Sequence, residues 1–299
     1  MSIRLQSRDY EIFRHMATFG FVTVNQLCAL VEPNCSGPNA NLWTYKNGIY
    51  IRLAALQREG LISSGHAPSL DGKTVSAYFL APKGASLLSD LREYEYLNTP
   101  RWLEKKSHFV WVQGPHDMAA CNFVANLLAL SRIVSSFTLG FWRASRDCRF
   151  YVFKNDTKHI FNPDLYMDFR WAGDDHIPMF VEIDTGHVNL TVIRRKAIRA
   201  FQYYGSGKFI EDLGSELFPR NLFICRSAAR LAVIARELQD AREKYQGPDA
   251  SLVRSFPVWL TTFDDVCIEA IDQGTVSNAP LCSSWRTLDG EKGVTPFKE

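Results

Sequence analysis

Three carboxylates are the residues whose types and spacing are best suited to chemistry. Asp164 follows Asn162-Pro163 at the start of a predicted strand, and Glu182 and Asp184 lie on the next predicted strand. Side chains two residues apart on a strand point to the same face, so Glu182 and Asp184 are expected side by side. If the two strands pair as a hairpin, Asp164 is brought beside them.

Such a carboxylate cluster predicts a divalent-metal site. Three negative charges in one place repel one another unless a cation neutralises them. Carboxylate oxygens suit Mg²⁺ or Mn²⁺. We therefore predict that an active site would hold Mg²⁺ or Mn²⁺ through Asp164, Glu182 and Asp184. The alternatives are that Asp164 caps a turn, and that Glu182 and Asp184 have basic partners in a purely structural role.

A predicted helix from about Trp43 to Glu59 carries side chains suited to DNA. Its apolar residues Ile49, Leu53 and Leu56 recur at helical spacing, so one face is buried. Residues largely off this stripe offer phosphate and base-edge contacts on a groove-entering helix. These are Tyr45, Lys46, Asn47, Tyr50 and Arg52. The alternative is a solvated helix face in a domain that binds protein.

Two shorter helices are predicted ahead of this one, over residues 7–31. Ser7 can cap the first helix with its hydroxyl group. Thr23-Val-Asn-Gln26 forms a capping box before the second, because the Thr23 and Gln26 side chains satisfy opposing backbone amides. The polar residues 32–41 then form a loop.

A β-hairpin is predicted after the third helix, which ends at Gly60 as a left-handed cap. Two short strands flank Asp71-Gly72-Lys73, and Pro82 opens a further helix. Lys73 at the tip is a candidate contact to phosphate or to the minor groove, although an exposed lysine needs no such role. The order helix, helix, helix, hairpin, helix over residues 1–90 resembles winged helix-turn-helix DNA-binding domains, as does the phrase Tyr-Phe-Leu-Ala-Pro-Lys-Gly.

Alternating helices and strands predict a second, larger α/β domain over residues 116–273. Residues 91–115 are predicted as a linker and residues 274–299 as a polar, poorly ordered C-terminal tail. The periodicities indicate helices over 116–132, 191–204 and 228–244 and strands around 137–142, 161–171, 178–184, 221–225 and 258–263. This pattern predicts an α+β protein whose second domain has a mixed central sheet with helices on its faces.

Composition excludes several classes of protein. The net charge is +2, with a mild basic excess in residues 1–110, which hold 12 Lys and Arg against 9 Asp and Glu. The seven cysteines are odd in number and include no CxxC pair, so neither a disulfide framework nor a zinc site is predicted. No apolar run approaches the roughly 20 residues that span a bilayer, and the N-terminus lacks a secretory signal. A cytoplasmic protein without membrane partners is therefore expected.

Residues 115–265 resemble the PD-(D/E)xK nuclease superfamily, which has a restriction-endonuclease-like fold. The matching pattern is Pro-Asp, a spacer, an apolar strand carrying Glu-x-(polar), and then a helix. In that family the acids hold metal ions that activate water for attack on a phosphodiester, which implies catalytic roles for Asp164, Glu182 and Asp184. The family normally has lysine where this chain has Asp184, so Lys196 on the next helix is the candidate replacement. An inactive site is the alternative.

More narrowly, the whole layout resembles the replication-relaxation family of plasmid and mobile-element proteins. The matching features are the winged helix, His116-Asp117 opening a helix, Asn-Pro-Asp164, and Phe180 to Gly186 followed by a helix with Lys and Tyr. The resemblance implies a role in plasmid replication, relaxation or transfer, with double-stranded DNA and replication or conjugation proteins as partners. His116 and Asp117 could instead be helix-start residues. Thr185 and His187 are expected to be solvated loop residues.

Three functions remain open at this point. The first is a DNA-binding accessory protein of a plasmid or mobile element, with a nuclease-like second domain that is active or inactive. The second is a metal-dependent DNA endonuclease that uses the three acids and Lys196. The third is a winged-helix transcriptional repressor. A homodimer would suit a winged helix that reads paired half-sites, although no coiled-coil heptad supports one.

Overall fold

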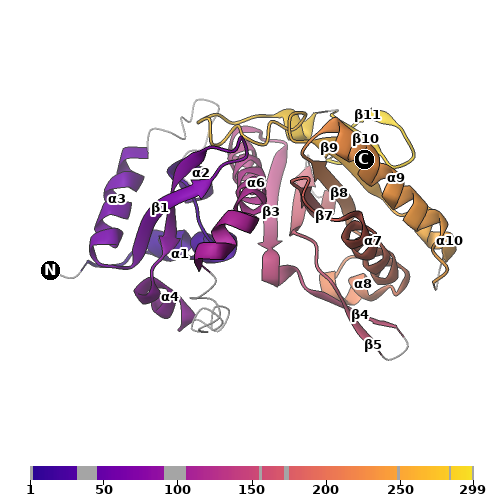
Figure 1. Cartoon of the computed structure of the whole chain (residues 1–299), viewed down its shortest axis with the longest axis horizontal. Helices are drawn as coiled ribbons and strands as arrows, with labels where there is room; N and C mark the ends of the chain where they lie inside the picture. The colour runs from indigo at the N-terminus through magenta and orange to yellow at the C-terminus, as the bar shows by residue number, and fades with distance from the viewer. Residues whose placement is uncertain are drawn as a thin grey trace. The chain divides into compact units, whose positions relative to one another are not determined.

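The computed structural model describes residues 3–31, 46–90, 106–154, 157–171, 175–247, 250–282 and 284–297. It has the predicted mixture of helices and strands, with a mixed multi-stranded sheet (Figure 1). The chain forms two compact units. Unit 1 comprises Met1–Ser135 and Ile268–Val276, and unit 2 comprises Ser136–Cys267 and Ser277–Glu299. Within the described residues, no helix combines the length and apolarity needed to cross a bilayer.

Unit 1 contains the elements in the predicted order of three helices, a hairpin and a further helix. The two strands pair antiparallel, from Ile62 opposite Leu80 to Pro68 opposite Thr74. A long helix follows. The elements are α1 (Ser7–Phe19), α2 (Val24–Val31), α3 (Lys46–Arg58), β1 (Ile62–Pro68), β2 (Thr74–Leu80), α4 (Pro82–Ser89) and α6 (Lys106–Ile133).

Local signals set most of these helix ends. The capping box before α2 is confirmed, because the Thr23 amide donates to Gln26 Oε1 at 2.8 Å and the Gln26 amide donates to Thr23 Oγ1 at 3.2 Å. Gly60 follows α3 with a φ of 69°, as predicted for a left-handed cap. The Ser7 cap was wrong. Gln6 is the N-cap of α1, and its amide donates to the Asp9 carboxylate at 2.6 Å.

Helix α6 begins earlier than the predicted 116–132 helix and belongs to unit 1. Residues 106–115 of the predicted linker are therefore helical, with Pro115 inside the helix, while residues 91–105 lie outside the described residues. The packing explains the grouping. Gln26 on α2 donates to Asn122, and Arg132 donates to the carbonyl of Ala29.

Unit 2 is built on a seven-stranded mixed sheet in the order β11-β10-β9-β8-β7-β6-β3. The central strands β7, β8 and β9 are parallel, and the flanking pairs are antiparallel. The strands are β3 (Phe137–Ala144), β6 (Leu165–Trp171), β7 (Asp175–Asp184), β8 (Arg220–Cys225), β9 (Val258–Thr262), β10 (Trp285–Thr287) and β11 (Lys292–Val294). Residues 172–174, between β6 and β7, lie outside the described residues.

Two predicted helices, α7 (Leu190–Gly205) and α9 (Ala228–Glu243), lie side by side on one face of this sheet (Figure 1). An additional hairpin of β4 (Phe150–Lys154) and β5 (Thr157–Phe161) was not predicted. Its rings join the core under α7, where Phe150 and Phe161 both contact Tyr203. Shorter elements complete the unit: η3 (Ser145–Cys148), α8 (Lys208–Leu213), α10 (Ala250–Val253) and η4 (Ala279–Leu281).

The polar C-terminal segment is folded, in contrast to the expected poorly ordered tail. Strand β10 pairs with β9, so the segment extends the main sheet. Trp285 and Phe297 are buried, and Phe297 packs against Phe137 and Phe169. These few aromatic anchors, spread through a polar sequence, give the segment the buried surface that its composition does not suggest.

Candidate functional site

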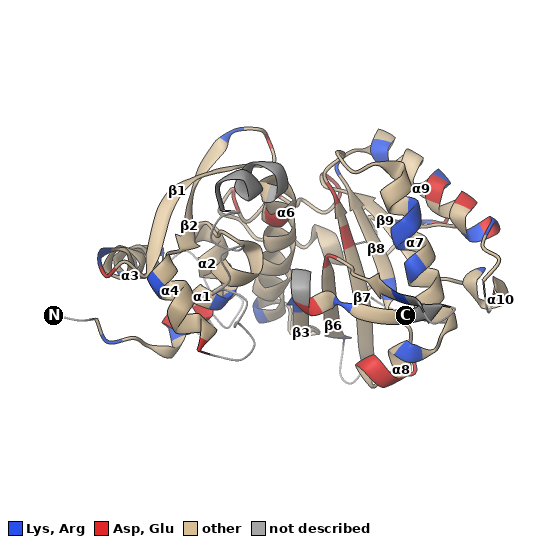
Figure 2. Ribbon diagram, turned by 60° about the horizontal axis from the view of Figure 1, so that its bottom comes forward, with Lys and Arg blue, Asp and Glu red and all other residues tan. Residues whose placement is uncertain are grey.

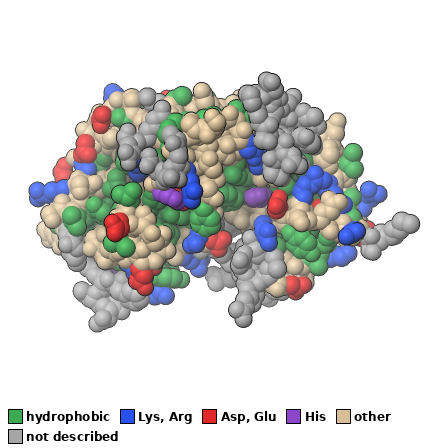
Figure 3. Space-filling model, turned by 180° about the vertical axis from the view of Figure 1, so that it is seen from behind, with side chains coloured by type: hydrophobic (Ala, Val, Ile, Leu, Met, Phe, Trp, Pro, Cys, Tyr) green, Lys and Arg blue, Asp and Glu red, His purple; other side chains and the backbone are tan. Residues whose placement is uncertain are grey.

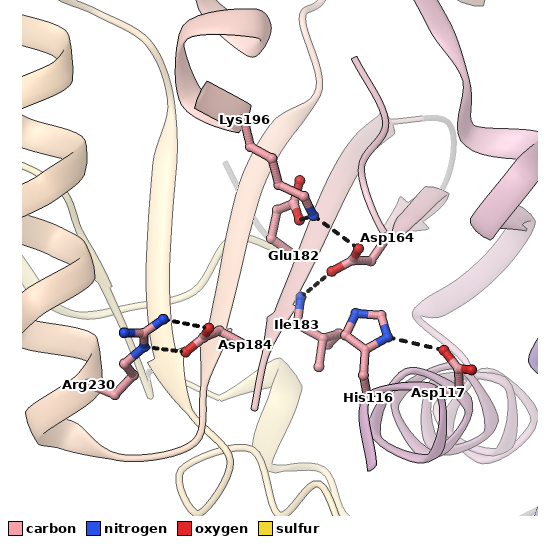
Figure 4. Close-up of polar contacts among 8 residues, drawn as sticks. All are labelled: His116, Asp117, Asp164, Glu182, Ile183, Asp184, Lys196 and Arg230. Carbon is pink, nitrogen blue, oxygen red and sulfur yellow. Dashed lines mark hydrogen bonds and ion pairs between the residues drawn. The ribbon is translucent and has the colours of Figure 1, made fainter. Parts of the chain in front are cut away.

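Two of the predicted acids and the predicted lysine converge in unit 2 (Figure 4). Asp164 directly precedes β6, Glu182 lies on β7, and Lys196 lies on α7. The ammonium group of Lys196 is 3.2 Å from Asp164 Oδ1 and donates to a carboxylate oxygen of Glu182. The second oxygen of Asp164 accepts the Ile183 amide at 2.8 Å, which ties the residue to β7. We refer to Asp164, Glu182 and Lys196 as the unit 2 triad.

Burial dominates the electrostatics of the triad. Burial raises the pKa of Glu182 to about 8, with a smaller increase from Asp164, while Lys196 lowers it. Burial by itself would lower the pKa of Lys196, but the two carboxylates outweigh it and hold that pKa above its ordinary value. A charged Lys196 therefore holds the two carboxyl groups together at neutral pH. Glu182 and Lys196 line a small pocket whose other walls are mostly apolar, including Phe161, Phe201 and Phe223.

Asp184 is placed apart from the triad. It shares the helix-covered face of β7 with Glu182, as the alternation of strand residues predicted. However, Arg230 on α9 donates to both of its oxygens, at 2.7 and 3.0 Å (Figure 4). The Asp184 side chain is only 3% exposed. Asp184 therefore pairs with a basic residue, as expected for the structural role that was the alternative to metal binding.

The donor set offers a limited fit to a divalent cation. Within the described parts of the chain, no group of three or more His, Cys, Asp or Glu residues is arranged to hold a metal. The two carboxylates of Asp164 and Glu182 remain, and Mg²⁺ often uses only one or two protein carboxylates together with water. In the structure, the Lys196 ammonium lies within ion-pair distance of both carboxyl groups. The pair would fit Mg²⁺ or Mn²⁺ only if that ammonium moved aside.

The remaining polar candidates are divided between the two units. In unit 1, His116 Nδ1 lies 3.1 Å from the carboxylate of its neighbour Asp117 on α6. In unit 2, His187 is exposed in the loop after β7, as expected. Thr185 is buried, in contrast to the expected solvated position.

The outer face of α3 holds part of the predicted DNA-binding set. Asn47 is exposed, Tyr50 is 45% exposed, and Lys46 is half-buried at the first residue of the helix. Tyr45 lies outside the described residues. Lys73 at the hairpin tip is 82% exposed, but its ammonium is 2.8 Å from the Asp71 carboxylate, which offsets its charge.

Arg52 is not available on that face. Its Nε donates to Asp9 Oδ1 at 2.7 Å, and a second nitrogen donates to the other Asp9 oxygen and to the carbonyl of Arg4 at 2.9 Å. Asp9 is completely buried, so this bidentate pair joins α1 to α3. The sequence gives no signal for the pairing, because the partners are far apart in the chain. The same is true of Arg230 and Asp184.

Charged side chains are distributed over both units. Figure 2 shows basic positions along α7 and acidic positions on α8 and α9. On the face shown in Figure 3, acidic and basic side chains are interspersed among hydrophobic ones. Part of the charge on α7 is neutralised within unit 2, because Arg194 pairs with Glu237 and Asp240.

A comparison with protein families identifies the chain. The family described as replication-relaxation matches residues 13–215, which is more than half of the 299 residues. The protein therefore belongs to the replication-relaxation family, as the order of motifs indicated. No curated protein and no solved structure matched the chain.

Proposed function

We propose that this protein is a DNA-binding accessory protein of plasmid or mobile-element replication, relaxation or transfer. In this proposal unit 1 is a winged helix-turn-helix domain, with α3 as the recognition helix and the β1–β2 hairpin as the wing. Family membership and the order of elements in unit 1 support the proposal. Unit 2 serves as a nuclease-like scaffold.

The exposed face of α3 is the observation that carries the proposal. Ile49, Leu53 and Leu56 are fully buried and fix one side of the helix against unit 1. The other side presents Asn47 and Tyr50, which can contact base edges and phosphates from a helix in the major groove. A rigid helix with a polar and aromatic outer face is suited to groove recognition.

Fluorescence anisotropy with labelled duplex DNA over a range of salt concentrations tests this proposal. Lys46→Ala is expected to weaken binding and to reduce the salt slope by about one, the value for one lost phosphate contact. Tyr50→Ala is expected to weaken binding with a smaller change in slope. Arg236→Ala, at an exposed position on α9, is the matched control for lost positive charge. Unchanged affinity and slope in both α3 variants would contradict the assignment of the recognition helix.

A metal-dependent DNA endonuclease is the second candidate, favoured by the convergence of the unit 2 triad. Asp164 and Glu182 would hold Mg²⁺ or Mn²⁺, which supplies an activated water for phosphodiester hydrolysis. Lys196 would then be free to stabilise negative charge on the phosphate. The proposal requires Lys196 to leave the position between the carboxylates that it has in the structure.

Incubation with supercoiled plasmid and Mn²⁺ separates the two candidates. The endonuclease proposal predicts nicking by the wild-type chain that is lost in Glu182→Ala and in Lys196→Ala. Asp168→Asn is the control, because Asp168 lies on β6 outside the triad and pairs with His176. Binding without nicking would support the accessory role and reject the endonuclease. Nicking that persists in Glu182→Ala would also reject it.

A further inference from the structure

The most outward-facing residues of α3 form a stripe, and only one of them, Asn47, is among the predicted DNA contacts. Positions 47, 51, 54 and 58 follow one another at helical spacing, on the side opposite the buried stripe of Ile49, Leu53 and Leu56. All four are exposed, and the residues are Asn47, Ile51, Ala54 and Arg58. We call them the α3 outer stripe. Ile51 is 71% exposed, the largest value among the exposed large hydrophobic residues of the described chain.

The two residues of this stripe in the first two turns, Asn47 and Ile51, carry no charge. Lys46, at the first residue of the helix, is half-buried and lies off the stripe. Arg52 is held by the buried carboxylate of Asp9. Arg58 lies in the last turn, where its Nε donates to the Ala54 carbonyl at 3.3 Å. The stripe therefore presents the amide of Asn47 and the aliphatic side chain of Ile51 in its first two turns, followed by the methyl group of Ala54.

These groups match one kind of base pair. Guanine is read most often by arginine or lysine, adenine by the two-point contact of an asparagine or glutamine amide, and the thymine methyl by apolar side chains. Recognition helices contact bases mainly through their N-terminal residues. We infer that the α3 outer stripe reads A·T pairs in the major groove, with Asn47 on adenine and Ile51 against the methyl group of thymine. This inference rests on the proposed function, since it assumes that α3 enters the groove.

A protein partner is the other occupant that an exposed isoleucine could suggest. The stripe is narrow, and the exposed polar residues Asn47, Gln57 and Arg58 lie on the same side of the helix. A stable protein interface needs about 800 Å² on each partner with an apolar centre. One isoleucine and one tyrosine on a single helix face provide much less, so the composition favours DNA over a second protein surface.

The test begins with selection of bound sequences from a pool of random duplex DNA by the full-length chain. The enriched site is then remade with deoxyuridine in place of each thymidine, which removes only the C5 methyl group. Wild-type affinity is expected to fall about threefold to fivefold at the thymidine that Ile51 contacts, the value for one buried methyl group. Ile51→Ala is expected to bind more weakly and to lose its sensitivity to that change. Val233→Ala, an exposed aliphatic position on α9, should behave as wild type.

The outcomes distinguish this inference from the proposed function. If the chain enriches no sequence and binds no duplex, both fail. If it binds DNA but the deoxyuridine effect is equal in wild type and Ile51→Ala, or the enriched site lacks A·T pairs, the inference fails and the proposed function stands. Loss of a homodimer in Ile51→Ala, measured by sedimentation, together with unchanged deoxyuridine sensitivity would assign the stripe to protein contact instead. Circular dichroism checks that the variant is folded.

Discussion

The buried carboxylates of Asp9 and Asp184 are each held by an arginine from another element. Arg52 holds Asp9 in unit 1, and Arg230 holds Asp184 in unit 2, each through two hydrogen bonds. Removing one member of such a pair leaves an uncompensated buried charge, which is far more costly than losing an exposed ion pair. Substitution of these arginines and aspartates is therefore expected to lower the stability of the fold rather than to remove a contact with DNA.

Arg52→Ala should lower the free energy of unfolding by about 3 kcal/mol, because the fully buried Asp9 loses its guanidinium partner. Chemical denaturation followed by circular dichroism measures this loss. Arg58→Ala, at an exposed position of the same helix, should change stability by less than about 0.5 kcal/mol. If Arg52→Ala keeps its stability but shows a reduced salt slope for DNA binding, the prediction is wrong and Arg52 contacts DNA.

At the residue scale, the sequence could suggest the triad only in part. The Pro-Asp164 and Glu182 motifs and the neighbouring helix with Lys196 are local patterns, and the structure brings these three together. The pairing of Asp184 with Arg230 joins positions separated by two helices and a strand, so no local pattern could reveal it. The alternation rule placed Asp184 on the correct face but could not say which side chain would meet it.

At the element scale, periodicity and capping residues predicted most helices and strands. Errors occurred where tertiary packing decides the conformation. The β4–β5 hairpin depends on Phe150 and Phe161 packing against α7, and β10 depends on Trp285 and on pairing with β9. Strand β10 has three residues, so its own sequence carries little signal. Strands β4 and β5 are rich in aromatic and β-branched residues, which favour strands, and the prediction did not use this signal.

The capping box of α2 gives a test at this scale. Thr23→Ala should destabilise the protein by about 1 kcal/mol, because the Gln26 amide loses the hydroxyl acceptor at the helix start. Thermal or chemical unfolding measures the difference. Thr18→Ala within α1 is the matched control, since Thr18 is inside a helix rather than at its cap. Equal effects of the two substitutions would show that the box contributes little.

At the scale of the whole molecule, residues far apart in the chain complete unit 1. The segment Ile268–Val276 belongs to this unit, and Asp272 accepts a hydrogen bond from Asn122 at 2.7 Å. The Asn25 side chain donates to the Asp272 carbonyl at 2.9 Å. The sequence predicted a division of the chain into consecutive domains. It could not predict that Ile268–Val276 packs with unit 1, because these contacts join positions separated by more than a hundred residues.

Asp272 should make stability depend on pH. Burial, with smaller effects from Glu269 and Asp71, raises its pKa from 3.8 to about 6, although Asn122 opposes the shift. The folded state therefore favours the protonated form. The contribution of Asp272 to stability is present below about pH 4 and is lost as the pH rises through 6.

Asp272→Asn removes this dependence while keeping the size of the side chain. The difference in unfolding free energy, variant minus wild type, should increase by about 2 kcal/mol between pH 4 and pH 7. Denaturation curves of both proteins at a series of pH values measure it. A difference that stays constant over this range would contradict the assigned role of Asp272.

The central claim is that the outer face of α3 lies against DNA, and site-specific photocrosslinking tests it most directly. p-Benzoylphenylalanine would replace Ala54 on the α3 outer stripe or, as a control, the exposed Val233 on α9. Irradiation with bound duplex DNA should produce a protein–DNA crosslink from position 54 and little from position 233. Binding without a crosslink from position 54, or with equal crosslinks from both positions, would contradict the account.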